Sequence, residues 1–418
     1  MKFTTTLCGL AGLLGLALAA VPIQNDGISA DIVVPDKYII KYKANADAGR
    51  KKKHESDVTS KAKKKNKKGV VDTINIDGLS GYVAEIPDSE LKELRDSDLI
   101  EYIEKDSIIK INGVAAAPVT ADPVEEEHEL AKRAYVTQLH AAWGLARISR
   151  RSTWNSGYYY DTTAGQGIRV YVLDTGIRTT HVEFEGRAVW GANFIAGSPN
   201  ADEYGHGTHV AGTIAGKTYG VAKKATVVAV KVLDKNGSGT MSGLILGLNW
   251  AVNNAKARGI AKKAVVNISL GGGYTASVNA AVKAATDAGL TIVVSAGNSN
   301  ANSGNYSPAS APSAITVGAI DGTRYRAWFS NWGSLVDIFA PGVSVLSAYH
   351  TSDTASWYMD GTSMAAPHVA GLAAYFIAKE NLSGSVAVTN RIYGASVTGV
   401  VGDPKGSWNR LAYNAGGA

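Results

Sequence analysis

The sequence predicts an α/β protein with a mostly parallel sheet and helices on both faces, preceded by a small α+β unit. Between residues 167 and 320, runs rich in Val and Ile alternate with helical stretches bounded by glycine. Strands that are buried on both faces have continuous apolar sequences, and their alternation with helices is typical of a parallel sheet. The runs are residues 168–173, 226–233, 264–269, 291–296 and 315–319, and the clearest helical stretches are 242–258 and 277–288.

The preceding unit differs from this pattern. Residues 36–43 and 81–86 alternate apolar and polar side chains as strands do, and residues 88–99 have helical spacing. Residues 50–68 are rich in lysine without interleaved aromatic side chains. We therefore interpret them as a solvated loop or helix face, and we expect no nucleic-acid partner.

The first 20 residues predict a secretory signal peptide. Lys2 precedes an apolar run at residues 7–18, and small side chains end the segment, so cleavage is expected near Ala19 or Ala20. The apolar run is too short to span a bilayer, and no later run is long enough. We expect a secreted protein with no membrane partner. Cys8, the only cysteine of the chain, would leave with the signal peptide.

The chain is expected to divide after Lys132-Arg133. Residues 115–129 are rich in Ala, Pro and Glu, which is typical of an exposed linker. Residues 1–133 contain 20 Lys and Arg against 22 Asp and Glu, whereas residues 134–418 contain 22 against 14. The expected parts are thus a signal peptide at 1–20, a pro-region at 21–133 and a basic main domain at 134–418.

Three segments carry groups that could perform chemistry. Asp174 ends the predicted strand 168–173, and a glycine-flanked histidine pair, His206 and His209, begins a helix of small residues. Ser363 lies where a buried helix begins, so the unpaired N–H groups of the first turn would stabilise a negative charge beside it. Capping of the helix is the alternative for Ser363. For the histidines the alternatives are a core position or a metal site, although only Asp202 and Glu203, just upstream, could add ligands.

The order Asp, His, Ser, with the surrounding residues, resembles the subtilisin-like serine proteases. The matching blocks are Asp174-Thr-Gly176, His206-Gly-Thr-His209 and Gly361-Thr-Ser-Met-Ala-Ala-Pro367. Residues 143–149, 217–223 and 306–310 are similar to the proteinase K branch. The resemblance implies a subtilisin-like fold and a secreted endopeptidase of broad specificity. It also implies that the pro-region is an inhibitor-type propeptide, which assists folding and blocks the groove.

Catalytic roles follow from the resemblance. Ser363 would be the nucleophile, His209 the general base and Asp174 the group that orients it, in the manner of the serine protease triad. His206 is assigned a structural role. The amide of Asn298 would donate to the oxyanion together with the backbone N–H of Ser363.

The resemblance also implies a substrate groove and a structural Ca²⁺ site. The groove residues are Gly237, Ser238, Gly239, Ser269, Leu270, Gly271, Gly272, Ala296 and Gly297. They would pair with the backbone of an extended protein substrate. The expected calcium ligands are the carbonyls of Pro312 and Ala314 and the carboxylate of Asp337, because hard cations prefer oxygen ligands.

Two other interpretations stay open. The chain could be a catalytically inactive relative that acts as a binding protein, or a processing convertase with an acidic pocket. Against the convertase, the pocket segments 269–272 and 295–298 contain no carboxylate. We expect instead a preference for large apolar or aromatic P1 side chains, a monomer, and cleavage at Lys132-Arg133 by a kexin-type protease or by the enzyme itself.

Overall fold

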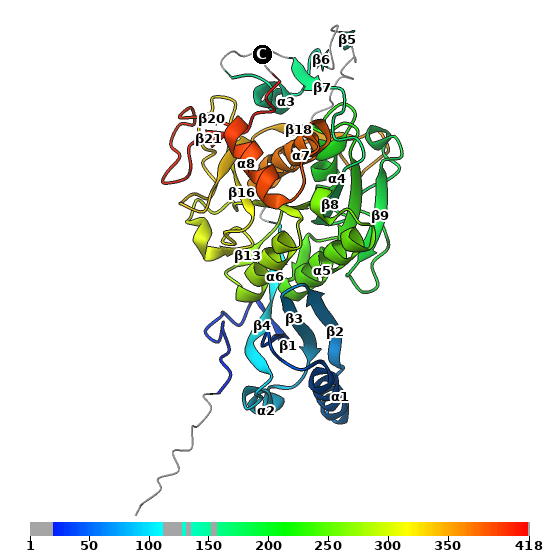
Figure 1. The fold of residues 1–418 in the computed structure, drawn as a ribbon, viewed down its shortest axis with the longest axis vertical. Coiled ribbons are helices and arrows are strands. Elements are labelled where there is room, and N and C mark those ends of the chain that lie inside the picture. Colours follow the sequence, from blue (N-terminus) through cyan, green and yellow to red (C-terminus); the bar gives the residue numbers. More distant parts are fainter. Residues whose placement is uncertain (1–19, 112–127, 131–134, 152–156, 417–418) are drawn as a thin grey trace, which may run out of the picture.

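The computed structural model describes residues 20–111, 128–130, 135–151 and 157–416. Nearly all of the predicted signal peptide, most of the predicted linker and the Lys132-Arg133 pair lie outside the described residues. Figure 1 shows a smaller N-terminal unit packed against one side of a larger α/β unit.

The N-terminal unit is a sheet with two helices on one face. Its strands and helices are β1 (Val33–Tyr42), α1 (Ala48–Lys64), β2 (Gly69–Ile76), β3 (Leu79–Glu85), α2 (Leu91–Arg95) and β4 (Ile100–Lys110). The predicted strands 36–43 and 81–86 are β1 and β3, and the lysine-rich segment forms most of α1. The predicted helix at 88–99 is shorter, because the chain leaves α2 after Arg95 and enters strand β4.

The larger unit is organised around a nine-stranded sheet in which every neighbouring pair is parallel except β20 and β21. The strands, in spatial order, are β20 (Val397–Thr398), β21 (Arg410–Leu411), β17 (Ile338–Pro341), β16 (Ile315–Ile320), β14 (Thr291–Ser295), β12 (Ala264–Ile268), β8 (Arg169–Asp174), β10 (Thr226–Lys231) and β9 (Ala188–Asn193). All five predicted runs are strands of this sheet.

Helices cover both faces of the sheet, as predicted. On β8, Val170 and Val172 pack into a core with α4 (His206–Ala215), α7 (Thr362–Glu380) and α8 (Ser385–Ala395). The alternate residues Tyr171 and Leu173 pack into a second core with α5 (Met241–Ala257) and α6 (Ala276–Asp287). Successive side chains of a strand point to opposite faces, so this arrangement explains the continuous apolar sequence of the central strands.

Short elements surround this sheet. They are β5 (His128–Leu130), β6 (Tyr135–Gln138), α3 (Trp143–Ile148), β7 (Tyr158–Asp161), β11 (Ser238–Thr240), β13 (Gly272–Gly273), β15 (Tyr306–Ser307) and the hairpin of β18 (Val345–Ala348) and β19 (Ser356–Met359). None of the helices in the described part of the chain is long and apolar enough to cross a membrane.

The two units share a core and a sheet edge. Ile39 and Val83 of the N-terminal sheet belong to the same buried cluster as residues of α5 and α6. Two carboxylates of β4 complete the contact: Glu104 accepts from the backbone N–H groups of Ala276 and Ser277, each at 2.8 Å, and Asp106 accepts from that of Ser242 at 2.9 Å. The N-terminal unit therefore supplies acceptors to the first turns of both helices.

Candidate active site

The site lies at the carboxyl end of β8, where α4 and α7 begin. β8 ends at Asp174, α4 begins at His206, and Ser363 is the second residue of α7. The carboxyl ends of parallel strands meet at one edge of the sheet, and ligands of open α/β sheets bind there. Three groups distant in sequence are thus brought together.

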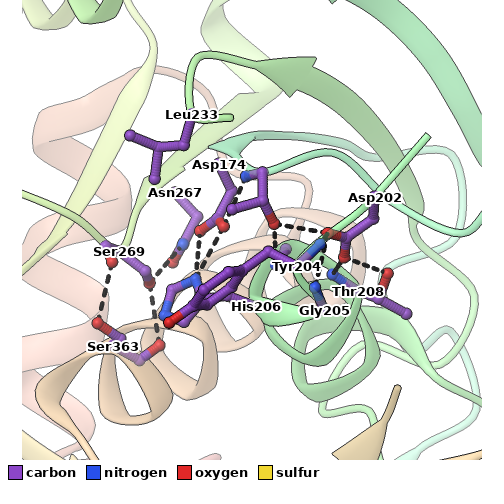
Figure 2. Close-up of polar contacts among 12 residues, drawn as sticks. Asp174, Asp202, Tyr204, Gly205, His206, Thr208, Leu233, Asn267, Ser269 and Ser363 are labelled. Carbon is purple, nitrogen blue, oxygen red and sulfur yellow. Dashed lines mark hydrogen bonds and ion pairs between the residues drawn. The ribbon is translucent and has the colours of Figure 1, made fainter. Parts of the chain in front are cut away.

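Asp174 is paired with His206. The Nδ1 atom of His206 lies 2.8 Å from Oδ1 and 2.9 Å from Oδ2 of the fully buried carboxylate. An acceptor at Nδ1 fixes the tautomer, because Nδ1 must then carry the hydrogen. The opposite atom, Nε2, is buried and has no hydrogen-bond partner among the described residues. Figure 2 shows the imidazole of His206 between Asp174 and Ser363.

The prediction that Asp174 orients His209 is wrong. His209 lies one turn further along α4, and its Nε2 atom is 3.0 Å from the carbonyl oxygens of Val345 and Trp357, so Nε2 donates to the β18–β19 hairpin. Burial, and next the nearby His206, lower the pKa of His209 to about 3. A ring that stays neutral and bonded to backbone carbonyls cannot shuttle a proton to Ser363. His209 is thus held by backbone carbonyls, whereas His206 is the histidine that contacts Asp174.

Glycine explains why His206 rather than His209 faces the strand end. A Cβ atom on Gly207 would lie 2.0 Å from the carbonyl oxygen of Gly176, so only glycine permits α4 to approach the segment after β8 this closely. Gly205 has a positive φ of 104°, which turns the chain into the helix. The closest approach is therefore next to His206, and the flanking glycines are the sequence signal that could have selected it.

Ser363 is held in the first turn of α7 by Ser269. Pro367 lacks the N–H that would bond the Ser363 carbonyl, and the Ser269 hydroxyl donates to that carbonyl at 3.0 Å instead. The Ser363 hydroxyl donates in turn to the Ser269 carbonyl at 2.9 Å. A rotation about the Cβ–Oγ bond of Ser363 would redirect its hydrogen. As Figure 2 shows, the hydroxyl lies on the side of His206 opposite Asp174.

Asn298 lies beside the start of α7. Its Oδ1 atom accepts from the backbone N–H of Thr362 at 2.9 Å and from the Thr362 hydroxyl at 2.8 Å. The same hydroxyl accepts from the N–H of Gly297 at 3.0 Å. Because Oδ1 accepts both bonds from Thr362, the oxygen end of the Asn298 amide faces α7.

A pocket joins Ser363 and Asn298 to the predicted groove. Six of the predicted groove residues line it: Ser269, Leu270, Gly271, Gly272, Ala296 and Gly297. Tyr306, Ser307, Pro308 and Ala309, which were not assigned to the groove, line it as well. No Asp or Glu belongs to the lining.

The other predicted groove residues lie across β4 from this pocket. β4 pairs antiparallel with β11, with Lys110 opposite Ser238 and Ile109 opposite Gly239. On the side of β4 opposite β11, Lys110 forms a β-bridge to Gly271. On the β11 side, the backbone N–H of Ile111 donates to the Gly237 carbonyl at 2.9 Å. The N-terminal unit thus lays a strand between the two predicted groove edges, and Lys110 lines the pocket of Ser363.

Comparisons with known proteins agree with this geometry. Residues 165–410 match the model of the subtilase family, and residues 37–112 match that of the peptidase inhibitor I9 family. The chain belongs to the subtilase family.

Relatives support the assignment over the whole chain. Subtilisin-like protease 2 of Pseudogymnoascus destructans is 46% identical over 428 residues, covering 100% of both chains. A cuticle-degrading protease of Metarhizium anisopliae is 43% identical over 386 residues, covering 92% of this chain and 91% of the relative. A crystal structure of a cold-adapted subtilisin-like serine proteinase is 42% identical and superposes with a TM-score of 0.63, covering 66% of this chain and 98% of that one. The prediction of a subtilisin-like serine protease with an inhibitor-type propeptide is confirmed.

The calcium ligands predicted for the subtilase domain lie at and before the starts of β16 and β17. Asp337 precedes β17, and Pro312 and Ala314 precede β16. Asp337 Oδ2 accepts from the backbone N–H of Thr316 at 2.9 Å. Burial is the main cause that raises the pKa of Asp337, to about 6. Within the described ranges, no three His, Cys, Asp or Glu side chains gather as a metal site.

Proposed function

We propose that Asp174, His206 and Ser363 form the catalytic triad of this subtilase. The observation that carries the proposal is the bond from His206 Nδ1 to Asp174, which leaves the buried Nε2 atom on the far side of the ring, without a hydrogen-bond partner among the described residues, where Figure 2 shows Ser363. Nε2 would take the proton of the Ser363 hydroxyl as the oxygen attacks a peptide carbonyl, and would return it to the leaving amine. Asp174 would hold the tautomer and stabilise the imidazolium. Water would then hydrolyse the acyl-enzyme.

The oxyanion would be bound by the side-chain amide of Asn298 and the backbone N–H of Ser363. The Oδ1 atom of Asn298 is engaged by Thr362, which orients the amide, and Ser363 lies in the first turn of α7, where N–H groups lack intrahelical acceptors. Loss of one such donor typically lowers kcat by about 10²–10³-fold.

Substrate would bind as an extended strand between Gly237–Gly239 and Ser269–Gly272. The position of β4 supports this mode, because its backbone already pairs with both edges. Backbone pairing depends little on side chains and therefore gives broad specificity. Apart from Lys110, which belongs to the propeptide strand β4, the pocket is lined by uncharged residues, so large apolar or aromatic P1 side chains would be favoured, since burying an arginine there without a carboxylate would cost several kcal/mol.

The protein would be made as a zymogen and exported. β4 occupies the groove, which supports the propeptide as an inhibitor and as a folding aid. The expected signal peptide at 1–20 and the pro-region boundary at Arg133 remain predictions.

Of the Asn-x-Ser/Thr sites, Asn236, Asn305 and Asn381 are exposed and could be glycosylated in the secretory pathway, whereas Asn267 is buried in β12. Monomeric enzyme is expected.

A structural Ca²⁺ would be held by Asp337 and the carbonyls of Pro312 and Ala314. The oxygen ligands suit this cation, and a partly buried carboxylate whose pKa is raised is a group that a cation would stabilise. Bound to the folded state alone, the ion would add stability to a mature domain that contains no cysteine.

Substitution of Ser363 tests the proposed chemistry. Ser363→Ala should abolish peptide hydrolysis while the protein folds, because no other described group is positioned as the nucleophile. Once the propeptide has been removed, a serine-directed phosphonate should label the wild-type protein on Ser363 and leave the variant unlabelled, as mass spectrometry of tryptic peptides would show. An unlabelled wild-type chain would favour the alternative of an inactive binding protein, and a Ser363→Ala variant with near-normal activity would refute the assignment.

A further inference from the structure

Asp202 is a buried carboxylate beside the site that the triad does not use. Its side chain is 7% exposed and accepts five hydrogen bonds. Oδ2 accepts from the Thr208 N–H at 2.9 Å and the Thr208 hydroxyl at 2.6 Å. Oδ1 accepts from the Thr175 hydroxyl at 2.8 Å, the Gly205 N–H at 2.8 Å and the Tyr204 N–H at 3.1 Å. Figure 2 shows these bonds converging at the N-terminus of α4.

These bonds fix the backbone on both sides of His206. Gly205 and Thr208 donate directly to Asp202, and Gly207 donates to the Thr175 hydroxyl at 2.9 Å, which itself donates to Asp202. A cap that only stabilised the helix would need the bonds to the first turn alone. Asp202 also accepts from the hydroxyl of Thr175, the residue that follows Asp174.

Thr175 connects this cap to the carboxylate that orients the histidine. Its backbone N–H donates to Asp174 Oδ1 at 2.8 Å, while its hydroxyl bonds Asp202 and Gly207. The strand end that carries Asp174 and the helix end that carries His206 are therefore locked to each other through one threonine and one aspartate.

A buried lysine supports the same segment. Lys231 is fully buried, and its Nζ atom donates to the carbonyls of Thr175 at 2.7 Å and Leu233 at 3.0 Å. Burial is the main cause that lowers its pKa, and the carboxylates of Asp202, Glu203 and Asp174 oppose that effect. A buried cation near two buried carboxylates keeps the local charge compensated.

We propose that Asp202 is a positioning residue of the peptidase: acting through Thr175 and the first turn of α4, it sets the position of the His206 imidazole between Asp174 and Ser363. The inference rests on the proposed triad. Asp202 itself touches neither substrate nor the reacting atoms. Displacement of a catalytic group by about 1 Å costs on the order of 10²-fold in rate.

Asp202→Asn in the full chain tests this role. An amide presents one acceptor oxygen, so its NH₂ group would face either the donors of Thr208 or those of Thr175, Gly205 and Tyr204. We expect kcat to fall by about 10²-fold with KM little changed, and phosphonate labelling of Ser363 to slow by a similar factor. If Asp202 were only a structural cap, the substitution would lower the melting temperature, but the folded variant would keep the wild-type kcat.

Thr175→Val provides a second variant should Asp202→Asn fail to fold. It keeps the volume of the side chain and the direct cap on α4, but removes the hydroxyl between Asp202 and Gly207. We expect a loss of about tenfold in kcat, again with KM little changed.

Asp321→Asn is the matched control. Asp321 also accepts from backbone N–H groups, those of Thr323 at 2.8 Å and Tyr325 at 3.1 Å, in a turn that does not line the pocket. It should keep wild-type kcat. Wild-type kcat and labelling rate in Asp202→Asn, or in Thr175→Val, would overturn the proposal. Failure of the phosphonate to label the wild-type enzyme after removal of its propeptide would instead refute the triad on which the proposal rests.

Discussion

The helices of the subtilase domain are capped from two different sources. The first turn of α4 donates to Asp202, which belongs to the same domain, whereas the first turns of α5 and α6 donate to Asp106 and Glu104 of the propeptide. These two carboxylates leave when the propeptide leaves, and α5 then keeps only its own cap, Thr240, which accepts from the N–H of Gly243 at 3.0 Å, whereas Asp202 stays beside His206. The difference indicates that the catalytic geometry belongs to the mature domain and that the propeptide contributes the block of the groove.

The largest expected effect tests the α4 side of this comparison. His206→Ala should lower kcat by about 10⁴-fold or more, because the group that accepts the Ser363 proton is removed. His209→Ala should cost stability through the lost bonds to Val345 and Trp357, and should lower kcat far less. Steady-state kinetics and thermal unfolding of both purified variants would measure the contrast. The opposite ranking would restore the assignment made from the sequence.

The second effect tests the propeptide side. Glu104→Gln should weaken the bonds to Ala276 and Ser277, and charge-assisted bonds of this kind contribute about 1.5–3 kcal/mol each. We expect the unprocessed chain to gain activity sooner, with its lag before hydrolysis shortened by about tenfold.

The control for that substitution is Asp77→Asn. Asp77 forms an exposed ion pair with Lys256 across the same interface at 2.6 Å, and exposed pairs contribute little. An equal change in the lag for both variants would show that the caps of α5 and α6 have no special role in inhibition.

The smallest expected effect concerns stability away from the groove. Because the folded-state pKa of Asp337 is raised to about 6, the folded state binds the proton more tightly than the unfolded state does. Without Ca²⁺, stability should therefore fall as pH rises from about 4 through 6 and then level off. Added Ca²⁺ should remove this fall, and Asp337→Asn should abolish both effects. Thermal unfolding across this range, with and without chelator, is the measurement, and identical curves for wild type and variant would exclude the site.

The sequence predicted the parts of the fold that local patterns determine. The apolar runs at 168–173 and 264–269 identified central strands, because burial on both faces requires such sequences. The pairing of β4 with β11 was not predictable in this way, since a strand edge gives no local sign of its partner. The helix expected at 88–99 ended early because the chain from Ile100 onward pairs with β1, a distant segment, as the start of β4.

The candidate site was predicted in position but not in every role. Asp174, Ser363 and six of the groove residues lie close to one another as expected, whereas the structure pairs Asp174 with His206 and not with His209. A spacing of three residues cannot distinguish them, because both lie near one face of α4. Their neighbours distinguish them: Gly207 lets His206 approach Asp174, and the carbonyls of the β18–β19 hairpin engage His209. Asp202 was considered only as a possible metal ligand, because its link to the Asp174 segment runs through Thr175, which is distant in the sequence.

The low-field proton NMR spectrum tests the pairing of Asp174 and His206 most directly. A hydrogen bond from a buried imidazole Nδ1 to a carboxylate gives a resolved resonance far downfield of the amide protons. In an inactive Ser363→Ala background, the account predicts that this resonance persists when His209 is replaced by alanine and disappears when His206 is replaced. Loss of the resonance in the His209 variant, with retention in the His206 variant, would contradict the account.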